Sequence, residues 1–189
     1  FEEDPPDHPE EFHQRGLYDT TDDDAVLDVE SLRAVCGYID FTANIRGDWH
    51  SLGGITAVAT PPESRRRGYA RQMVDSIHEE LRANGTAFAA LWPFDYEFYC
   101  RLGYEMCNTY QQATVPAAKL DAGAAGPDGQ FVHLAPDDYA RLDSVYRSWA
   151  TQTLGLRRSE DWWRHRVFSA WHTERYVYGW EDDDATLRG

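Results

Sequence analysis

The chain has 189 residues, 42% of them hydrophobic, which suffices for the core of one large domain or of one domain and part of another. Its formal net charge is −15, and Lys119 is the only lysine among 18 basic residues. This charge argues against a general nucleic-acid binder, because neutralising phosphates needs a broad basic face, and it favours cationic substrates.

The acidic, lysine-poor composition has two open interpretations. It is typical of a halophilic protein, whose acidic surface keeps it dispersed in a salt-rich cytosol, but an ordinary acidic protein has a similar composition. The sequence contains no apolar run of membrane-spanning length and no targeting segment, so we expect a soluble, cytoplasmic protein with no membrane partner. Because the sequence starts at Phe1 rather than Met, we also expect a piece of a longer polypeptide.

The first half of the sequence alternates strand and helix patterns. A short strand is expected at residues 15–19, and apolar, β-branched segments at 32–41 and 54–60 predict two more strands in an antiparallel meander. Residues 70–84 have apolar positions at helical spacing and end at Asn84-Gly85, which predicts a long helix.

Further elements follow this helix. Residues 86–92 are nearly all apolar, which predicts a strand buried on both faces. Asp95 can cap a short helix at 96–102, after which Gly103 can take the left-handed conformation. Residues 104–115 are then expected to be extended.

The sequence also predicts a second unit. Residues 117–130 are rich in small residues and glycine, which indicates a linker. Beyond it we expect a strand at 131–134, a helix at 136–153, a helix start at Ser159 and a strand at 174–180. These elements are too few for a complete domain, so we expect the unit to continue past Gly189.

The segment that carries chemistry runs from Val58 to Arg71. A strand leads into a proline-bearing turn, three arginines and Gly68, and the long helix then begins. Unpaired N–H groups at a helix N-terminus bind phosphate, and arginines add charge-assisted donors, so the segment predicts a pyrophosphate site. The alternative is a solvated basic turn before an ordinary amphipathic helix. Neither GxxxxGK[ST] nor GxGxxG after a first strand is present.

The run RRRGYA at 65–70 resembles the (Q/R)xxGx(G/A) signature of the GCN5-related N-acetyltransferase (GNAT) superfamily. The resemblance implies an α/β fold with a mixed, mostly antiparallel sheet flanked by helices. It also implies that this loop holds the pyrophosphate of acetyl-CoA and that a bulged strand pairs with the pantetheine arm. Val58, Ala59 and Thr60 occupy the matching strand, and a bulge there frees backbone donors that can polarise the thioester carbonyl.

A second block, FYCRLGY at 98–104, is similar to the FYxxxGF/Y segment of the same superfamily. The resemblance gives Tyr99 the role of general acid toward the departing thiolate, a reaction that suits a phenol. The alternative for Tyr99 is an aromatic ring packed on a helix face. Phe94 and Asp95 fall where neighbours of the cofactor lie in the family.

The strand, the triple arginine, the tyrosine block and the linker together resemble the enhanced intracellular survival subgroup. This resemblance implies an acetyl-CoA-binding domain at 1–116, a linker at 117–130 and the start of a degenerate second GNAT-like domain at 131–189. In that subgroup a third, sterol-carrier-like domain supplies a C-terminal carboxylate as the general base, and this sequence does not contain it. The first strand and its helices, which normally shape the acceptor pocket, are also absent or lie upstream.

The function implied is that of an N-acetyltransferase in which a primary amine attacks acetyl-CoA directly. A cationic acceptor is expected, such as an aminoglycoside, a polyamine or a lysine side chain. The alternative functions are a non-catalytic acyl-CoA sensor and an interaction domain. A homo-oligomer is also compatible with the sequence. The histidines show no metal-ligand spacing, so no metal site is expected. The expected cofactor-binding residues are Val58, Ala59, Thr60, Arg65, Arg66, Arg67, Gly68, Tyr69, Ala70, Arg71, Phe94 and Asp95.

Overall fold

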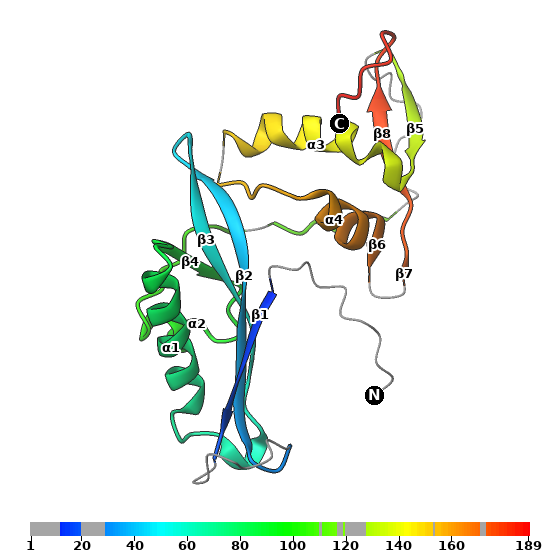
Figure 1. The fold of residues 1–189 in the computed structure, drawn as a ribbon. Coiled ribbons are helices and arrows are strands. Elements are labelled where there is room, and N and C mark those ends of the chain that lie inside the picture. The colour runs from blue at the N-terminus through cyan, green and yellow to red at the C-terminus, as the bar shows by residue number, and fades with distance from the viewer. Residues whose placement is uncertain are drawn as a thin grey trace. The chain divides into compact units, whose positions relative to one another are not determined.

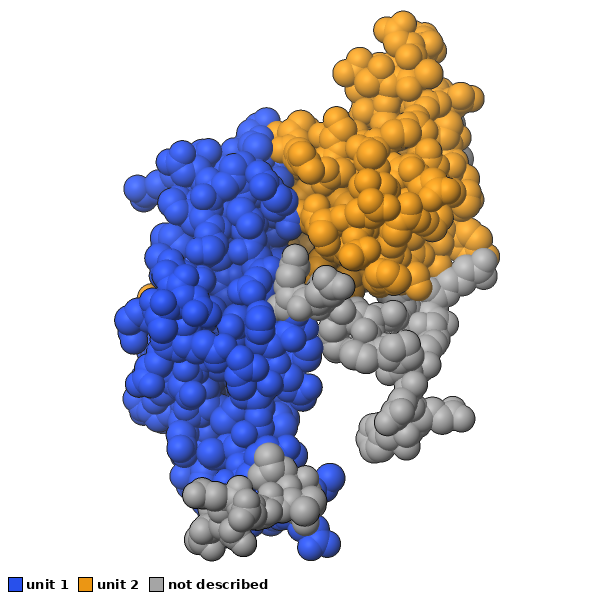
Figure 2. Space-filling view, viewed as in Figure 1, with its two compact units in different colours: residues 1–104, 150–157 blue, residues 105–149, 158–189 orange. Residues whose placement is uncertain are grey.

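The computed structural model describes residues 12–19, 29–109, 111–116, 119, 128–152, 154–170 and 173–189. Most of the expected linker at 117–130 lies outside these residues. The chain divides into two compact units, one of residues 1–104 and 150–157 and the other of residues 105–149 and 158–189 (Figure 2).

The first unit is built on a four-stranded sheet with the order β1-β2-β3-β4 (Figure 1). Strands β1, β2 and β3 pair antiparallel, as expected of the meander, and β3 pairs with β4 in parallel. The predicted mixed, mostly antiparallel fold class is therefore confirmed. The elements of this unit are β1 (Phe12–Tyr18), β2 (Leu32–Ile45), β3 (Asp48–Ala59), the 3-10 turn η1 (Pro62–Ser64), α1 (Tyr69–Ala83), β4 (Phe88–Leu91) and α2 (Tyr96–Cys100).

A tight two-residue turn joins β2 and β3. Arg46 and Gly47 both have positive φ, 56° and 100°, and Ile45 pairs with Asp48 across the turn. Two successive positive φ values give the turn a twist that matches the twist of the paired strands. The turn allows β2 and β3 to extend well beyond the segments expected from the sequence, which covered only their most apolar parts.

Helix α1 covers one face of the sheet and forms the core with it (Figure 1). The buried residues that recur along α1 at helical spacing meet buried residues of β2 and β3, and these are Met73, Val74, Ile77, Leu81, Ala34, Cys36, Tyr38 and Ile55. The helix approaches the sheet so closely that a Cβ added to Gly53 would lie 2.5 Å from Cδ1 of Leu81. The predicted long helix is confirmed to within one residue at either end.

Strand β4 differs from the expectation of a strand buried on both faces. It has only four residues, none of them fully buried, and Phe88 at its start is 40% exposed. The prediction of burial on both faces, made from the apolar composition, is wrong. Among the described residues, β4 pairs with β3 alone and forms an edge of the sheet. Residues 104–115 were expected to be extended, and the described part of this segment, 104–109 and 111–115, contains no strand either.

A segment distant in sequence completes the first unit beside β2. The backbone N–H of Asn44 donates to Gly155 O at 2.8 Å, and the backbone N–H of Arg157 donates to Thr42 O at 2.7 Å. The Arg157 guanidinium lies 5.0 Å from the centre of the Trp49 ring, which adds a cation–π contact. These bonds use the part of the β2 edge that extends past the pairing with β1.

The second unit pairs β5 with β8 antiparallel and places Leu134, Phe168 and Leu187 in its core. Ser159 caps α4 by accepting from Trp162 N at 3.1 Å, which confirms the predicted helix start. The described helices include none that is both long and apolar enough to cross a membrane. The elements are β5 (Gln130–Leu134), the 3-10 turn η3 (Pro136–Asp138), α3 (Tyr139–Ala150), α4 (Glu160–Trp162), the π-helical turn η4 (Trp163–Phe168), β6 (Ser169–Ala170), β7 (Thr173–Glu174) and β8 (Val177–Glu181).

Candidate cofactor and active site

A β-bulge interrupts β3 near its carboxyl end. Val35 of β2 pairs with Ala59, but Gly37 pairs with Thr56, so β3 has one residue more than β2 across this interval. Ala57 takes the left-handed conformation there, with φ of 53°. Because the extra residue of a bulge is left out of the ladder, backbone groups at this point are free to meet a ligand. The bulge expected near Val58 is thus present.

Strands β3 and β4 part at the same end of the sheet. Their parallel pairing runs only from Leu52 with Phe88 to Ile55 with Leu91. Strand β3 continues to Ala59, whereas β4 ends at Leu91. The last four residues of β3, which include the bulge, consequently have no partner in β4, and a split opens between the two strands.

The turn after β3 brings the chain to the start of α1. Arg66 and Gly68 have positive φ, 61° and 85°, and Gly68 is the N-cap residue of the helix. Gly68 has no side chain to cap the first-turn N–H groups, and no acidic residue lies in that turn, so these donors can bind an anion. Arg65 is held over the turn by its Nε, which donates to Thr60 O at 3.3 Å.

The bulge, the turn and the start of α1 surround one cavity of about 630 Å³. Three arginines and no carboxylate side chain line it, in a chain that has 33 acidic residues, so the cavity is suited to an anionic ligand. Its lining residues are Val58, Ala59, Thr60, Ser64, Arg65, Arg66, Gly68, Tyr69, Ala70, Arg71, Phe94 and Phe98.

The cavity gathers all but two of the expected cofactor-binding residues. Arg67 does not line it, although it stands in the same run as Arg65 and Arg66. Asp95 does not line it either, and its carboxylate instead caps α2 by accepting from Phe98 N at 3.0 Å. Phe98 and Ser64 line the cavity and were not predicted. Phe98 is the first residue of the FYCRLGY block and stands next to Tyr99. Its place in that block is the feature of the sequence that could have predicted its role in the cavity.

Tyr99 lies behind this cavity rather than in its wall. Its residue is only 3% exposed, and its ring contacts Phe94 and Phe98 edge-on, with centroids 5.3 Å and 4.9 Å away. Burial, together with the electrostatic influence of the Cys36 thiol, raises the pKa of Tyr99 to about 12. The phenol is therefore protonated at neutral pH.

The fold is that of GNAT proteins. The structure aligns with a conserved protein of unknown function from Enterococcus faecalis V583, a probable N-acyltransferase, at a TM-score of 0.67 and 18% identity, over 85% of this chain and 41% of that one. It also aligns with Eis1 from Mycobacterium abscessus at a TM-score of 0.56 and 20% identity, over 83% of this chain and 41% of that one.

The sequence identifies the family directly. The profile of the Acetyltransferase (GNAT) domain matches residues 1–107, and the chain belongs to the GNAT acetyltransferase family. It is 29% identical to the N-acetyltransferase Eis of Mycobacterium tuberculosis (strain CDC 1551 / Oshkosh) over 134 residues, 67% of this chain and 33% of that protein. It is 31% identical to the N-acetyltransferase Eis of Mycobacterium bovis (strain ATCC BAA-935 / AF2122/97) over 117 residues, 58% of this chain and 29% of that protein. The chain thus spans about a third of the length of these relatives.

Proposed function

We propose that this chain is the acetyl-CoA-binding part of an N-acetyltransferase that transfers the acetyl group to a primary amine. The observation that carries the proposal is the arginine-lined cavity, which joins the start of α1 to the bulge of β3. A long anionic thioester needs both features, because its pyrophosphate requires cationic donors and its pantetheine arm requires free backbone groups.

Arg65, Arg66 and the first-turn N–H groups of α1 hold the pyrophosphate in this proposal. The pantetheine arm lies along β3 at the bulge, where a backbone N–H near Ala59 or Thr60 polarises the thioester carbonyl. Phe94 and Phe98 supply apolar wall to the same cavity. The proposed co-substrate is acetyl-CoA, and no metal takes part.

The neutral amine attacks the thioester carbon directly, so a C–N bond forms as the C–S bond breaks. The departing thiolate accepts the proton of Tyr99 in this proposal, since the phenol is protonated at neutral pH and its ring packs against Phe94 and Phe98 of the cavity wall. The proton lost by the amine passes to a general base outside the residues assigned here, directly or through water. A net charge of −15 favours a cationic acceptor such as a polyamine, an aminoglycoside or a lysine side chain.

Calorimetric titration with acetyl-CoA tests the cofactor site. Two variants compare arginines of one run: Arg65→Ala/Arg66→Ala removes cavity-lining groups, and Arg67→Ala removes a neighbour that does not line the cavity. Each lost charge-assisted bond is expected to weaken binding about tenfold or more, whereas Arg67→Ala is expected to bind within about threefold of wild type.

Three other outcomes would change the proposal. If the folded wild type does not bind acetyl-CoA, the cofactor site is wrong and the arginine run becomes a surface for an acidic partner. If all three arginines contribute equally, general charge attraction rather than this cavity explains the binding. If acetyl-CoA binds tightly but no amine in a panel of polyamines, aminoglycosides and lysine peptides is acetylated, the chain is an acyl-CoA sensor.

A further inference from the structure

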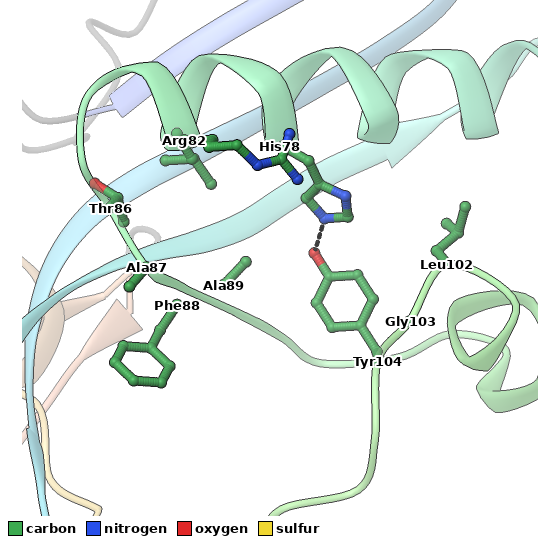
Figure 3. A pocket seen from close by; sticks show the side chains of 10 residues that line it. His78, Arg82, Thr86, Ala87, Phe88, Ala89, Leu102, Gly103 and Tyr104 are labelled. Carbon is green, nitrogen blue, oxygen red and sulfur yellow. Dashed lines mark hydrogen bonds between the residues drawn. The ribbon is translucent and has the colours of Figure 1, made fainter.

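A second cavity in the first unit contains a histidine and a tyrosine joined by a hydrogen bond. The cavity has a volume of about 310 Å³ and lies between the carboxyl-terminal half of α1, the start of β4 and the turn after α2 (Figure 3). The Nε2 atom of His78 lies 2.7 Å from the hydroxyl oxygen of Tyr104. None of its lining residues is shared with the arginine-lined cavity.

Both members of this pair are neutral at neutral pH, because burial raises the pKa of Tyr104 and lowers the pKa of His78. A neutral imidazole has one nitrogen that donates and one that accepts, and a phenol can do either, so the tautomer of His78 decides which side chain donates. In both cases the bond joins Tyr104 to α1.

Tyr104 also contacts Tyr99 in two ways. The two rings meet edge-on, with centroids 5.7 Å apart. The backbone N–H of Tyr104 donates to the carbonyl oxygen of Tyr99 at 3.1 Å, beside a second bond to that oxygen from Leu102 at 2.9 Å. The left-handed conformation of Gly103, with φ of 90°, folds the chain back so that Tyr104 reaches Tyr99.

The ring neighbours of Tyr99 connect it to the cofactor cavity in two ways. Phe94 and Phe98 belong to the same short stretch of chain as Tyr99 and line the arginine-lined cavity. Tyr104 is in addition hydrogen-bonded to α1, whose first turn lines the same cavity. The His78–Tyr104 bond thereby connects the element that carries Tyr99 to the element that begins at the pyrophosphate loop.

We propose that His78 and Tyr104 are positioning residues for Tyr99, through the edge-on contact between the two tyrosine rings. The inference rests on the proposed function, in which Tyr99 donates a proton to the leaving thiolate. Loss of the hydroxyl of Tyr104, or of the bonding nitrogen of His78, removes the bond that holds the Tyr104 ring against Tyr99, so the Tyr99 ring becomes freer to move. The rate of acetyl transfer then falls while acetyl-CoA binding is retained.

A double-mutant cycle tests this coupling in the full-length protein. Tyr99→Phe alone is expected to lower kcat about 100-fold, as for loss of a general acid. Tyr104→Phe alone is expected to lower kcat about fivefold, with KM for acetyl-CoA within twofold of wild type. In the Tyr99→Phe background, Tyr104→Phe is expected to have no further effect, because there is no phenol left to position.

Variants at His78 and a cavity control complete the design. His78→Gln, whose amide can accept or donate the hydrogen bond, should retain most of the activity, and His78→Leu should match Tyr104→Phe. Thr86→Val alters the same cavity without touching the pair and should leave kcat unchanged. Without any ligand, ¹³C-tyrosine NMR should show faster ring flipping of Tyr99 in Tyr104→Phe than in Thr86→Val.

The outcomes separate this inference from the proposed function. If Tyr104→Phe lowers kcat equally in the wild-type and Tyr99→Phe backgrounds, or leaves the Tyr99 ring motion unchanged, the positioning role is overturned and the general acid stands. If Tyr99→Phe leaves kcat unchanged, both the general acid and its positioning are wrong. Circular dichroism and the thermal midpoint identify any variant whose loss of activity reflects unfolding.

Discussion

Gly68 has a backbone conformation that other residues adopt at a cost. Its φ is 85°, and a Cβ added there would meet no heavy atom within 4 Å, so Gly68→Ala introduces backbone strain without a clash. Gly47 in the turn between β2 and β3 combines the same two properties, with φ of 100°, and lines neither cavity. It is therefore a matched control for a substitution at the start of α1.

We predict that Gly68→Ala and Gly47→Ala each lower the free energy of unfolding by about 1 kcal/mol, because each forces alanine into the left-handed region. Only Gly68→Ala should also weaken acetyl-CoA binding, since it disturbs the loop that presents Arg66 and the first-turn N–H groups. Urea unfolding and calorimetry measure the two effects separately. Equal loss of affinity in both variants would contradict a specific role for the loop.

The sequence predicts the phosphate loop but not which of its arginines face the cavity. The run RRRGYA predicts a phosphate loop because the residue types required are adjacent, and the structure places Arg65 and Arg66 at the cavity. Nothing in the run distinguishes Arg67, because the direction of each side chain depends on the positive φ of Arg66, a property of the folded turn. Asp95 has two compatible roles in the sequence, helix cap and neighbour of the cofactor, and the structure confirms the predicted cap through the bond that its carboxylate accepts from Phe98 N.

At the scale of single elements, the bulge of β3 restricts which residues can occupy position 57. Ala57 has φ of 53°, a conformation that is especially unfavourable for a β-branched residue. Ala57→Val is therefore expected to lower the free energy of unfolding by about 2 kcal/mol or to remove the bulge. Ala57→Gly should be within about 1 kcal/mol of wild type, because relief of strain offsets the greater entropy of the unfolded chain.

The same two variants should differ in ligand binding. If Ala57→Val shifts the register of β3, the backbone groups near Ala59 no longer face the split, and acetyl-CoA affinity should fall, whereas Ala57→Gly should bind as wild type does. Calorimetry and urea unfolding again provide the measurements. Wild-type affinity in a folded Ala57→Val protein would show that the bulge does not hold the pantetheine arm.

Elements were predicted well where their own residues determine them and poorly where neighbours do. Helix α1 was predicted nearly to its ends because its apolar positions, its Gly68 start and its Asn84 stop are all local. The edge position of β4 and the absence of strand at 104–109 and 111–115 depend on what pairs with them, and no local pattern contains that information. The bulge was expected only through family resemblance, since Ala57 gives no local signal.

At the scale of the whole molecule, charge is the property that dominates. A formal net charge of −15 on 189 residues makes the folded state repel itself, and the chain carries 33 acidic residues to produce it. Several described carboxylates are paired with arginines, as Glu80 is with Arg15 at 2.6 Å and Arg188 with Asp182 at 2.6 Å. Such exposed pairs contribute little individually, so the excess charge determines how the protein responds to salt.

We predict that added KCl stabilises the protein by screening this repulsion. The Debye length falls from about 10 Å at 0.1 M to about 3 Å at 1 M, so the thermal midpoint should rise steeply at low salt and level off near 1 M. Sucrose is the control, because it favours compact states without screening charge and should give a shallow, unsaturating rise. A midpoint that does not change with KCl would show that charge repulsion does not limit the stability of the fold. Acetyl-CoA affinity should fall over the same range, since its attraction to Arg65 and Arg66 is screened as well.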